Sequence, residues 1–283
     1  MELHHGFTLI ELSIGLVIIG LLIGGVLFGR DLIEGAAIRK QMSNLAQLDS
    51  NVNAFKMKFA SLPGDMSMSK AAQFGLPYDA TAQSGGNNFH NENGVIDQYS
   101  SSFDDLSLCR NRTGIGRVCV NVTTTYWGEP HYFMRQLYEA RLSPYRVTSN
   151  TPSDLPNSAA KLDYGDGYLV VGTSTWAKGG YYLGMGTSNP ASMWFGNSAF
   201  GAFTSAQAMQ FDTKFDDGKP TTGIVRAAHW ESGGYGMNVD YGPLAGGTTY
   251  PRNCVSGAVS AAVYDLTTKP GSKECGLWVQ GQW

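Results

Sequence analysis

The feature that most constrains this chain of 283 residues is a long apolar run close to its N-terminus. From Phe7 to Gly29 there is no Lys, Arg, Asp or Asn, and the only ionisable side chain is Glu11. The run has 23 residues, and about 20 apolar residues in a helix are enough to cross the hydrocarbon core of a bilayer. We therefore predict a transmembrane helix over these residues.

A removable secretory signal peptide is the competing interpretation, and three observations count against it. The apolar run is longer than the core of about 7–15 residues that such signals have. No small-x-small cleavage pattern directly follows Phe28, where the sequence is Gly29-Arg30-Asp31. The third observation is that the helical pattern does not stop where the apolar run stops. The run is therefore interpreted as a segment that is retained in the mature protein.

After Arg30 the apolar residues are spaced by three or four positions, as on one face of an amphipathic helix. These residues are Ile38, Met42, Leu45, Leu48, Val52, Phe55 and Phe59. We predict one helix from Phe7 to Phe59, roughly 80 Å long at about 1.5 Å per residue, which Pro63-Gly64 ends. Its first half lies in lipid or in a bundle of helices, and its second half packs on a domain.

Glu11 is the anomaly in the apolar run. A carboxylate within a membrane segment is costly unless it is paired, and by default such a residue is functional. One interpretation is that Glu11 reaches the membrane interface, because it lies only four residues after Phe7. The other is that it pairs with a cation. Since the run contains no Lys or Arg, a newly made α-amino group at Phe7 of a neighbouring copy would be that cation.

The residues around Glu11 resemble a known processing signal. The string Gly6-Phe7-Thr8-Leu9-Ile10-Glu11, followed by a long apolar helix, is similar to the cleavage and assembly signal of type IV pilins and type II secretion pseudopilins. The resemblance implies that a membrane prepilin peptidase cuts between Gly6 and Phe7, and that the new N-terminal Phe7 is methylated. It also implies that residues 1–6 are a leader peptide and that Glu11 pairs with the N-terminus of a neighbouring copy in a filament.

Two features depart from the usual pattern of that family. The leader carries His4 and His5 where the family has Lys or Arg, so the positive-inside rule is not obeyed. The basic residues instead follow the apolar run, at Arg30, Arg39 and Lys40. Phe28 also stands at mature position 22, where many members have proline. Any flexibility that this proline usually provides must come from the glycines of the helix.

The remainder of the chain predicts a large head of mixed structure. We predict an α+β, pilin-like fold in which one antiparallel sheet packs against the second half of the long helix. The divisions are residues 1–6 (leader), 7–29 (transmembrane or filament-core helix), 30–62 (amphipathic continuation) and 63–283 (globular head). In the head, helices are predicted at 130–142 and 204–215, strands at 168–171, 181–183, 223–230, 254–266 and 277–279, and loops at 79–102 and 149–159.

The four cysteines, Cys109, Cys119, Cys254 and Cys275, all lie beyond the membrane segment. An even number of cysteines in an oxidising compartment favours disulfides, and three connectivities are possible. Pairing of nearest neighbours, 109 with 119 and 254 with 275, closes short loops and is the preferred prediction. The spacing does not match a zinc site, which needs closer pairs such as C-x2-C.

Two oxygen-rich segments are candidates for calcium, which prefers six to eight oxygen ligands. One contains Asn91, Asn93 and Asp97, together with Asn87 and Asn88. The other contains Asp212, Asp216 and Asp217. Neither has EF-hand spacing, and solvated turns explain the same residues, so no metal or other cofactor is required by the sequence.

The composition excludes some function classes. The formal net charge is −3, from 20 basic and 23 acidic residues, which leaves no electrostatic signature for nucleic acid. Motifs of serine hydrolases, zinc proteases and nucleotide-binding proteins are absent. Glu129 with His131, and His229 with Glu231, are read as ordinary polar groups. The aromatic residues of the head are read as core, with an adhesive surface as the alternative.

We therefore expect a structural filament subunit and not an enzyme. It would be made as a single-pass precursor in a bacterial inner membrane and would mature into an extracellular or periplasmic filament. Its expected partners are copies of itself, the prepilin peptidase and an inner-membrane assembly platform. Two alternatives stay open: a pseudopilin of a type II secretion system, and a membrane-anchored adhesin or hydrolase ectodomain that does not polymerise.

Overall fold

A computed structural model describes residues 8–78, 90, 92–96, 117–119, 129–143, 145–147, 159–174, 179–185, 201–230, 237–238, 254–257, 261–268, 270–273 and 275–283 of the chain. Within these residues the helices are α1 (Leu9–Phe59), α2 (Met68–Gln73), α4 (Glu129–Glu139) and α6 (Ser205–Phe215). The strands are β1 (Arg117–Cys119), β2 (Ala160–Lys161), β3 (Tyr168–Ser174), β4 (Gly180–Met185), β5 (Val225–Trp230), β6 (Met237–Asn238), β7 (Val255–Ser256), β8 (Val263–Tyr264) and β9 (Gly276–Gln280).

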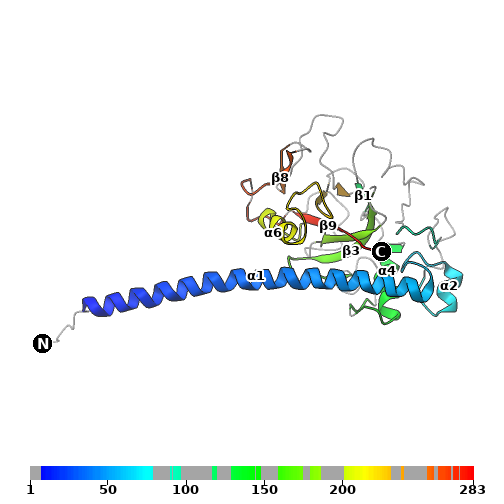
Figure 1. Ribbon diagram of the computed structural model, residues 1–283, viewed down its shortest axis with the longest axis horizontal. Coiled ribbons are helices and arrows are strands. Elements are labelled where there is room, and N and C mark those ends of the chain that lie inside the picture. The colour runs from blue at the N-terminus through cyan, green and yellow to red at the C-terminus, as the bar shows by residue number, and fades with distance from the viewer. Residues whose placement is uncertain are drawn as a thin grey trace.

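The long helix α1 is continuous over 51 residues, and its first half extends away from the head (Figure 1). This confirms the predicted single helix. Its end differs in cause from the prediction: Ala60 adopts the left-handed conformation with φ 51° and caps the helix before Pro63 is reached. The N–H of Ala60 donates to the carbonyl of Lys56, which satisfies one of the free carbonyls of the last turn.

The head is built on an antiparallel sheet, as predicted. Strands follow the order β1-β6-β5-β9-β4-β3-β2, and β1 also pairs with β3, so that the ladder returns to itself. The central register joins Tyr181 to Val279 across β4 and β9, and Val225 to Val279 across β5 and β9. The predicted strand over 254–266 is wrong: within the described residues this segment forms β7 and β8, two short strands that pair with each other in a separate two-stranded sheet.

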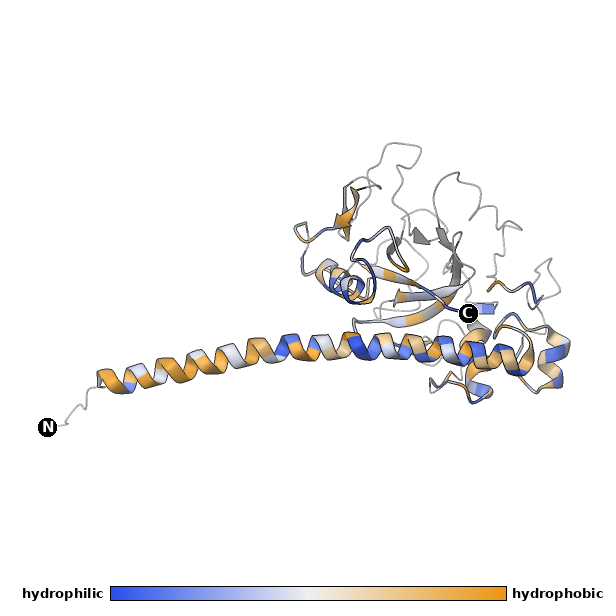
Figure 2. Ribbon diagram, in the orientation of Figure 1, coloured by the Kyte–Doolittle hydropathy of each residue, from blue (hydrophilic) through white to orange (hydrophobic). Residues whose placement is uncertain are grey.

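The core lies between α1 and one face of this sheet. Strand residues alternate in direction, and those facing the helix are the apolar Tyr181, Leu183, Leu277 and Val279. The helix side is the amphipathic stripe predicted from the spacing. Ile38, Leu45, Leu48, Val52 and Phe55 are each at most 1% exposed. In the view of Figure 2, α1 is mostly hydrophobic beyond the head and mixed along it.

Polar contacts fix the helix on the sheet as well. The side-chain carbonyl of Gln41 accepts the N–H of Asp163 at 2.8 Å. The hydroxyl of Tyr181 donates to Asp49 at 2.8 Å, and that of Tyr164 donates to Glu34 at 2.8 Å. Burial and the neighbouring carboxylate of Asp49 hold the pKa of Tyr181 well above its usual value. These contacts run from Glu34 to Asp49 and fix one position of the head along α1.

The two predicted helices of the head are present with shifted ends. α4 begins at Glu129 and ends at Glu139, and α6 begins at Ser205 with Thr204 as its N-cap. The hydroxyl of Thr204 accepts the N–H of Gln207, whose side chain accepts the N–H of Thr204 in return. The sequence did not predict α2, β1, β2 or β6. Each of these is at most six residues long, too short for a recognisable period.

Candidate processing and assembly site

The first turn of α1 contains a reciprocal cap between two polar residues. Thr8 is the N-cap, and its hydroxyl accepts the N–H of Glu11 at 3.3 Å. One carboxylate oxygen of Glu11, Oε2, accepts both the N–H and the hydroxyl of Thr8 at 2.8 Å. This is a capping box, which satisfies two of the N–H groups that a helix start leaves free.

The capping box gives Glu11 a role that the interpretation from the sequence missed. The S/T-x-x-E pattern at Thr8 to Glu11 is itself a sequence signal for a helix start. Only Oε2 is engaged in the described part of the chain, and Oε1 accepts no hydrogen bond there. Gly6 and Phe7, the predicted cleavage and methylation positions, lie outside the described residues. The pairing of Glu11 with a neighbouring N-terminus stays a prediction.

The surface that follows Glu11 is apolar and uncovered. No residue from Leu9 to Ile33 is buried, and Leu9, Ile10 and Leu21 expose more than 70% of their area. Within the described residues, α1 is the single helix long and apolar enough to cross a membrane, judged by its length and composition. An apolar surface of this extent needs lipid or other apolar surfaces to cover it.

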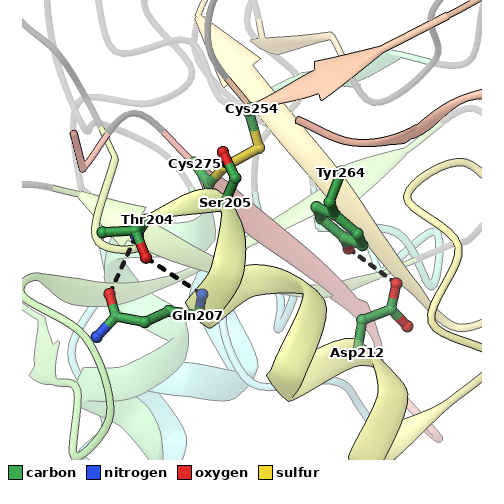
Figure 3. Close-up of a disulfide and its surroundings, with 7 residues drawn as sticks. All are labelled: Thr204, Ser205, Gln207, Asp212, Cys254, Tyr264 and Cys275. Atoms are coloured by element: carbon green, nitrogen blue, oxygen red, sulfur yellow. Dashed lines mark hydrogen bonds between the residues drawn. A yellow bond between two sulfur atoms is a disulfide. The ribbon is translucent and has the colours of Figure 1, made fainter. Parts of the chain in front are cut away.

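One predicted calcium group is brought together by the fold. Asp212, Asp216 and Asp217 have carboxylate oxygens within 4.8 Å of one another, at the end of α6. Each of the three carboxylates also accepts hydrogen bonds from the protein itself. Asp212 accepts from the Tyr264 hydroxyl at 2.8 Å (Figure 3) and from the Gly218 N–H at 3.3 Å. The group therefore forms a self-contained turn whose carboxylates already have partners.

Asp216 and Asp217 close the loop that follows α6. The carboxylate of Asp216 accepts the N–H groups of Ile224 and Val225, at the start of β5. That of Asp217 accepts the N–H of Lys219 at 2.9 Å and the hydroxyl of Thr222. These acceptors connect helix to strand, which explains an acidic pair at this position without a cation.

The other predicted calcium segment, around Asn93, is bound by Asp65, a residue that the sequence analysis did not name as a site. Asp65 is 1% exposed, and its two carboxylate oxygens accept the N–H groups of Asn93 at 3.2 Å and Gly94 at 2.8 Å. Its backbone carbonyl accepts the N–H of Glu92 at 3.1 Å. Asn91 and Asp97 lie outside the described residues. The described part of this segment is thus held by Asp65.

Gly64, next to Asp65, is required by a close approach of α4. Its N–H donates to the side chain of Gln136 at 2.7 Å. A Cβ at this position would lie 2.3 Å from the backbone oxygen of Glu129, and the φ of +86° is one that glycine adopts freely. The Leu62–Asp65 turn is therefore the junction that joins the end of α1 to the start of α4.

Two of the four cysteines form a disulfide, as predicted. Cys254 and Cys275 are bonded, and both are buried (Figure 3). The bond lies beside the start of α6, and Cys275 directly precedes β9. The Sγ atom of Cys275 also lies 3.6 Å from the hydroxyl of Ser205. Cys119 is in β1, while Cys109 lies outside the described residues, so their pairing stays a prediction.

Of the remaining candidates, those whose side chains the structure describes lie in the core. Glu129 is completely buried and accepts the N–H of His90 at 2.8 Å, which marks it as a structural group. Tyr181 and Tyr182 are also buried, so they belong to the core and not to an adhesive surface. The side chains of His131, His229 and Glu231 lie outside the described residues.

Comparison with known proteins identifies the N-terminal segment. Residues 3–27 match the model of the prokaryotic N-terminal methylation motif. No curated protein and no solved structure gave a significant match. The motif implies a prepilin-like precursor that prepilin peptidase processes, and proteins of this kind are typically structural subunits without enzymatic activity. The chain thus carries, at residues 3–27 and continued by the apolar half of α1, the N-terminal methylation motif that is typical of type IV pilins and pseudopilins.

Proposed function

We propose that this protein is a structural subunit of a type IV pilus-like filament, which polymerises through the first half of α1. One observation carries the proposal: Leu9 to Gly29 is apolar apart from Glu11 and Ser13, and none of these residues is buried by the described part of the chain. The same surface can be covered by lipid before assembly and by helices of neighbouring copies afterwards. A subunit that moves from the membrane into a filament needs a surface that both lipid and neighbouring helices can cover.

Glu11 is the residue on which assembly depends in this proposal. Cleavage between Gly6 and Phe7 creates an α-amino group one residue before Thr8, and methylation keeps its positive charge at neutral pH. Oε2 of Glu11 caps its own helix, and Oε1 is available for the amine of a neighbouring copy. The charge of Glu11 therefore guides the docking of each new subunit, while its hydrogen bonds keep the first turn helical.

The proposed life of the molecule begins in the inner membrane, where the apolar helix anchors the precursor. Prepilin peptidase removes residues 1–6 and the inner-membrane assembly platform adds the subunit to a growing filament. A pilus subunit then appears on the cell surface and serves adhesion, motility or uptake, whereas a type II secretion pseudopilin forms a periplasmic fibre. The N-terminal motif is common to both, so the destination of the fibre is what separates them.

Three substitutions test the assembly mechanism by separating the charge of Glu11 from its cap. Glu11→Gln keeps the capping box, because Gln can replace Glu at that position, but removes the charge. Thr8→Ala keeps the charge and removes the hydroxyl that accepts the N–H of Glu11. Glu11→Val removes both functions. We expect Glu11→Gln and Glu11→Val to give processed protein in the membrane and no filaments, while Thr8→Ala still gives filaments at reduced yield.

The measurement is the yield of protein in the sheared surface or periplasmic fraction relative to the membrane fraction, with intact-mass analysis of each. The mature mass should begin at Phe7 and include one methyl group in the wild-type protein and in all three variants. Normal filament yield from Glu11→Gln would contradict the charge-pairing mechanism. Retention of residues 1–6 in surface material would contradict processing and favour a membrane-anchored ectodomain.

A further inference from the structure

The end of the head nearest the apolar half of α1 carries two cations beside one glycine. Gly35 is the first buried residue of α1. The point where a Cβ of Gly35 would lie is 3.5 Å from Lys214 Nζ and 3.9 Å from an Nη atom of Arg39. Lys214 belongs to the last turn of α6, and α6 lies at that end of the head (Figure 1). Gly35, which has no side chain, therefore lies between the two positive groups.

Neither cation has an acidic partner within the described part of the chain. The ion pairs found there are Lys40–Asp163, Lys70–Glu92 and Lys273–Asp166. The acids closest in sequence are engaged elsewhere: Glu34 accepts the Tyr164 hydroxyl, and Asp216 accepts two backbone N–H groups. Both cations are exposed. Two adjacent positive charges repel each other, and an anion between them would relieve that repulsion.

The position of the pair along α1 points to the source of the anion. The apolar run ends at Gly29, and Gly35 follows Gly29 by six residues, which is about 9 Å of helix at about 1.5 Å per residue. The polar layer on each side of the hydrocarbon core is about 5–8 Å thick. In a helix that crosses the membrane, Gly35 therefore lies at the outer edge of this layer, where the long side chains of Lys214 and Arg39 beside it reach the lipid headgroups.

We infer that Lys214 and Arg39 bind the phosphate of an anionic phospholipid over Gly35 and hold the α6 end of the head on the membrane surface before assembly. The arginine offers a planar fork and the lysine a compact charge, and both suit phosphate oxygens. The absence of a side chain on Gly35 leaves the space between the cations open. This inference rests on the membrane-inserted precursor of the proposed function.

The test uses the full chain, one copy per lipid nanodisc, in phosphatidylcholine alone or mixed with phosphatidylglycerol. The readout is the rate at which an amine-acylating reagent modifies Lys214, measured by mass spectrometry, with Lys56 at the far end of α1 as internal reference. A basic side chain at an anionic surface gains about 1 kcal/mol, which corresponds to roughly fivefold. We therefore expect Lys214 to react about fivefold more slowly, relative to Lys56, in the nanodiscs that contain phosphatidylglycerol.

Two variants that each remove one positive charge from α1 show where on the protein the protection of Lys214 arises. Arg39→Gln should return the rate ratio close to that in phosphatidylcholine, while Lys58→Gln, at the distal end of α1, should leave the protection unchanged. Inorganic phosphate added to phosphatidylcholine nanodiscs should give no protection, because the lipid surface is what concentrates the headgroup at this site. Protection by free phosphate alone would overturn the lipid as the source.

Equal rates in both lipids, or protection that Arg39→Gln leaves intact, would overturn the inference. Protection that occurs only with several copies per nanodisc would also overturn it, because the anion would then come from a second copy of the chain. A chain that inserts normally but shows no dependence on lipid contradicts this inference alone. A chain that does not insert into nanodiscs contradicts the proposed function.

Discussion

Asp212 shows how a single carboxylate at the end of α6 couples the head to pH. It is fully buried, and it accepts hydrogen bonds from Tyr264 and Gly218. Burial raises its pKa to about 7, and the charges of Asp217 and Asp216 act in the same direction, while the two hydrogen bonds oppose them. At neutral pH this group is therefore close to its titration midpoint.

We predict that the head loses stability as the pH rises from about 4 to about 7. Asp212 in the unfolded chain gives up its proton near pH 3.9, while the folded protein keeps that proton until about pH 7. The folded state binds more protons over this range, so the free energy of unfolding falls with pH. The fall is at most about 4 kcal/mol, since three pKa units correspond to about 1.36 kcal/mol each.

Asp212→Asn should remove most of this slope, because the amide can still accept from Gly218 and can donate to the Tyr264 oxygen. Chemical denaturation of wild type and variant at pH 4, 5.5 and 7 measures it. Hydrogen bonds from Thr268 and Thr267 hold the pKa of folded Asp265 well below its usual value, so folded Asp265 stays ionised in this range. Its unfolded form titrates near pH 3.9 and opposes the Asp212 slope only at the acidic end. A wild-type slope that millimolar calcium abolishes would instead assign the acidic turn to a cation.

The hydrogen-bond partners of a polar side chain can be read from the sequence only where they lie close to it along the chain. The Thr8–Glu11 cap and the Thr204–Gln207 cap both follow from a spacing of three residues that can be read directly. Asp65 was not predictable as a hub, because the N–H groups that it accepts are 28 and 29 residues away. A local pattern contains the local partner, whereas a distant partner is known only once the chain has folded.

At the scale of elements, length decided what the sequence could predict. α1 and α6 were predicted almost to the residue, because several turns of periodic apolar residues support each of them. The segment 254–266 was wrongly read as one strand, because small and apolar residues run through most of it, whereas in its described part Val255–Ser256 pairs with Val263–Tyr264. Gly257, with φ 99°, turns the chain after β7, and a single glycine gives little warning of such a turn.

The disulfide is the element-scale constraint that we expect to matter most for stability. Cys254 and Cys275 join the start of β7 to the start of β9 across 21 positions. Closing a loop of this size contributes about 3 kcal/mol in the chain-entropy model. The double substitution Cys254→Ala and Cys275→Ala should therefore lower the melting temperature of the head by roughly 6–12 °C, at about 2–4 °C per kcal/mol for a domain of this size.

Thermal unfolding with and without reductant checks this prediction and extends it. Reductant should lower the wild-type melting temperature at least to that of the untreated double variant. If reductant also lowers the melting temperature of the double variant, the further loss comes from a link between Cys109 and Cys119. A wild-type protein that reductant leaves unchanged would contradict a stabilising role for Cys254–Cys275.

For the whole molecule, the burial along α1 shows which part of the helix belongs to the core of the head. The predicted head began at residue 63, with the amphipathic segment 30–62 as a separate part. In the structure, Glu34 to Phe59 forms one wall of the core of the head, whereas nothing before Glu34 is buried in the described part of α1. We propose that the folding unit is residues 30–283 and that the first half of α1 is an independent assembly element.

This division predicts opposite outcomes for two truncations. A chain that begins at Arg30 should melt within a few degrees of the detergent-solubilised full-length protein, because residues 9–29 make no buried contact with the described part of the head.

A chain that begins at Pro63 lacks Ile38, Leu45, Leu48, Val52 and Phe55, which are completely or almost completely buried. At about 1.5–3 kcal/mol for each side chain, their loss is comparable with the whole stability of a domain, about 5–15 kcal/mol. We expect no cooperative unfolding from this shorter chain, measured by near-ultraviolet circular dichroism on heating. Adding a peptide of residues 30–62 should restore part of the transition, because the stripe would again cover the sheet. Cooperative melting of the shorter chain alone would show instead that the head holds its own core and that the helix only rests on it.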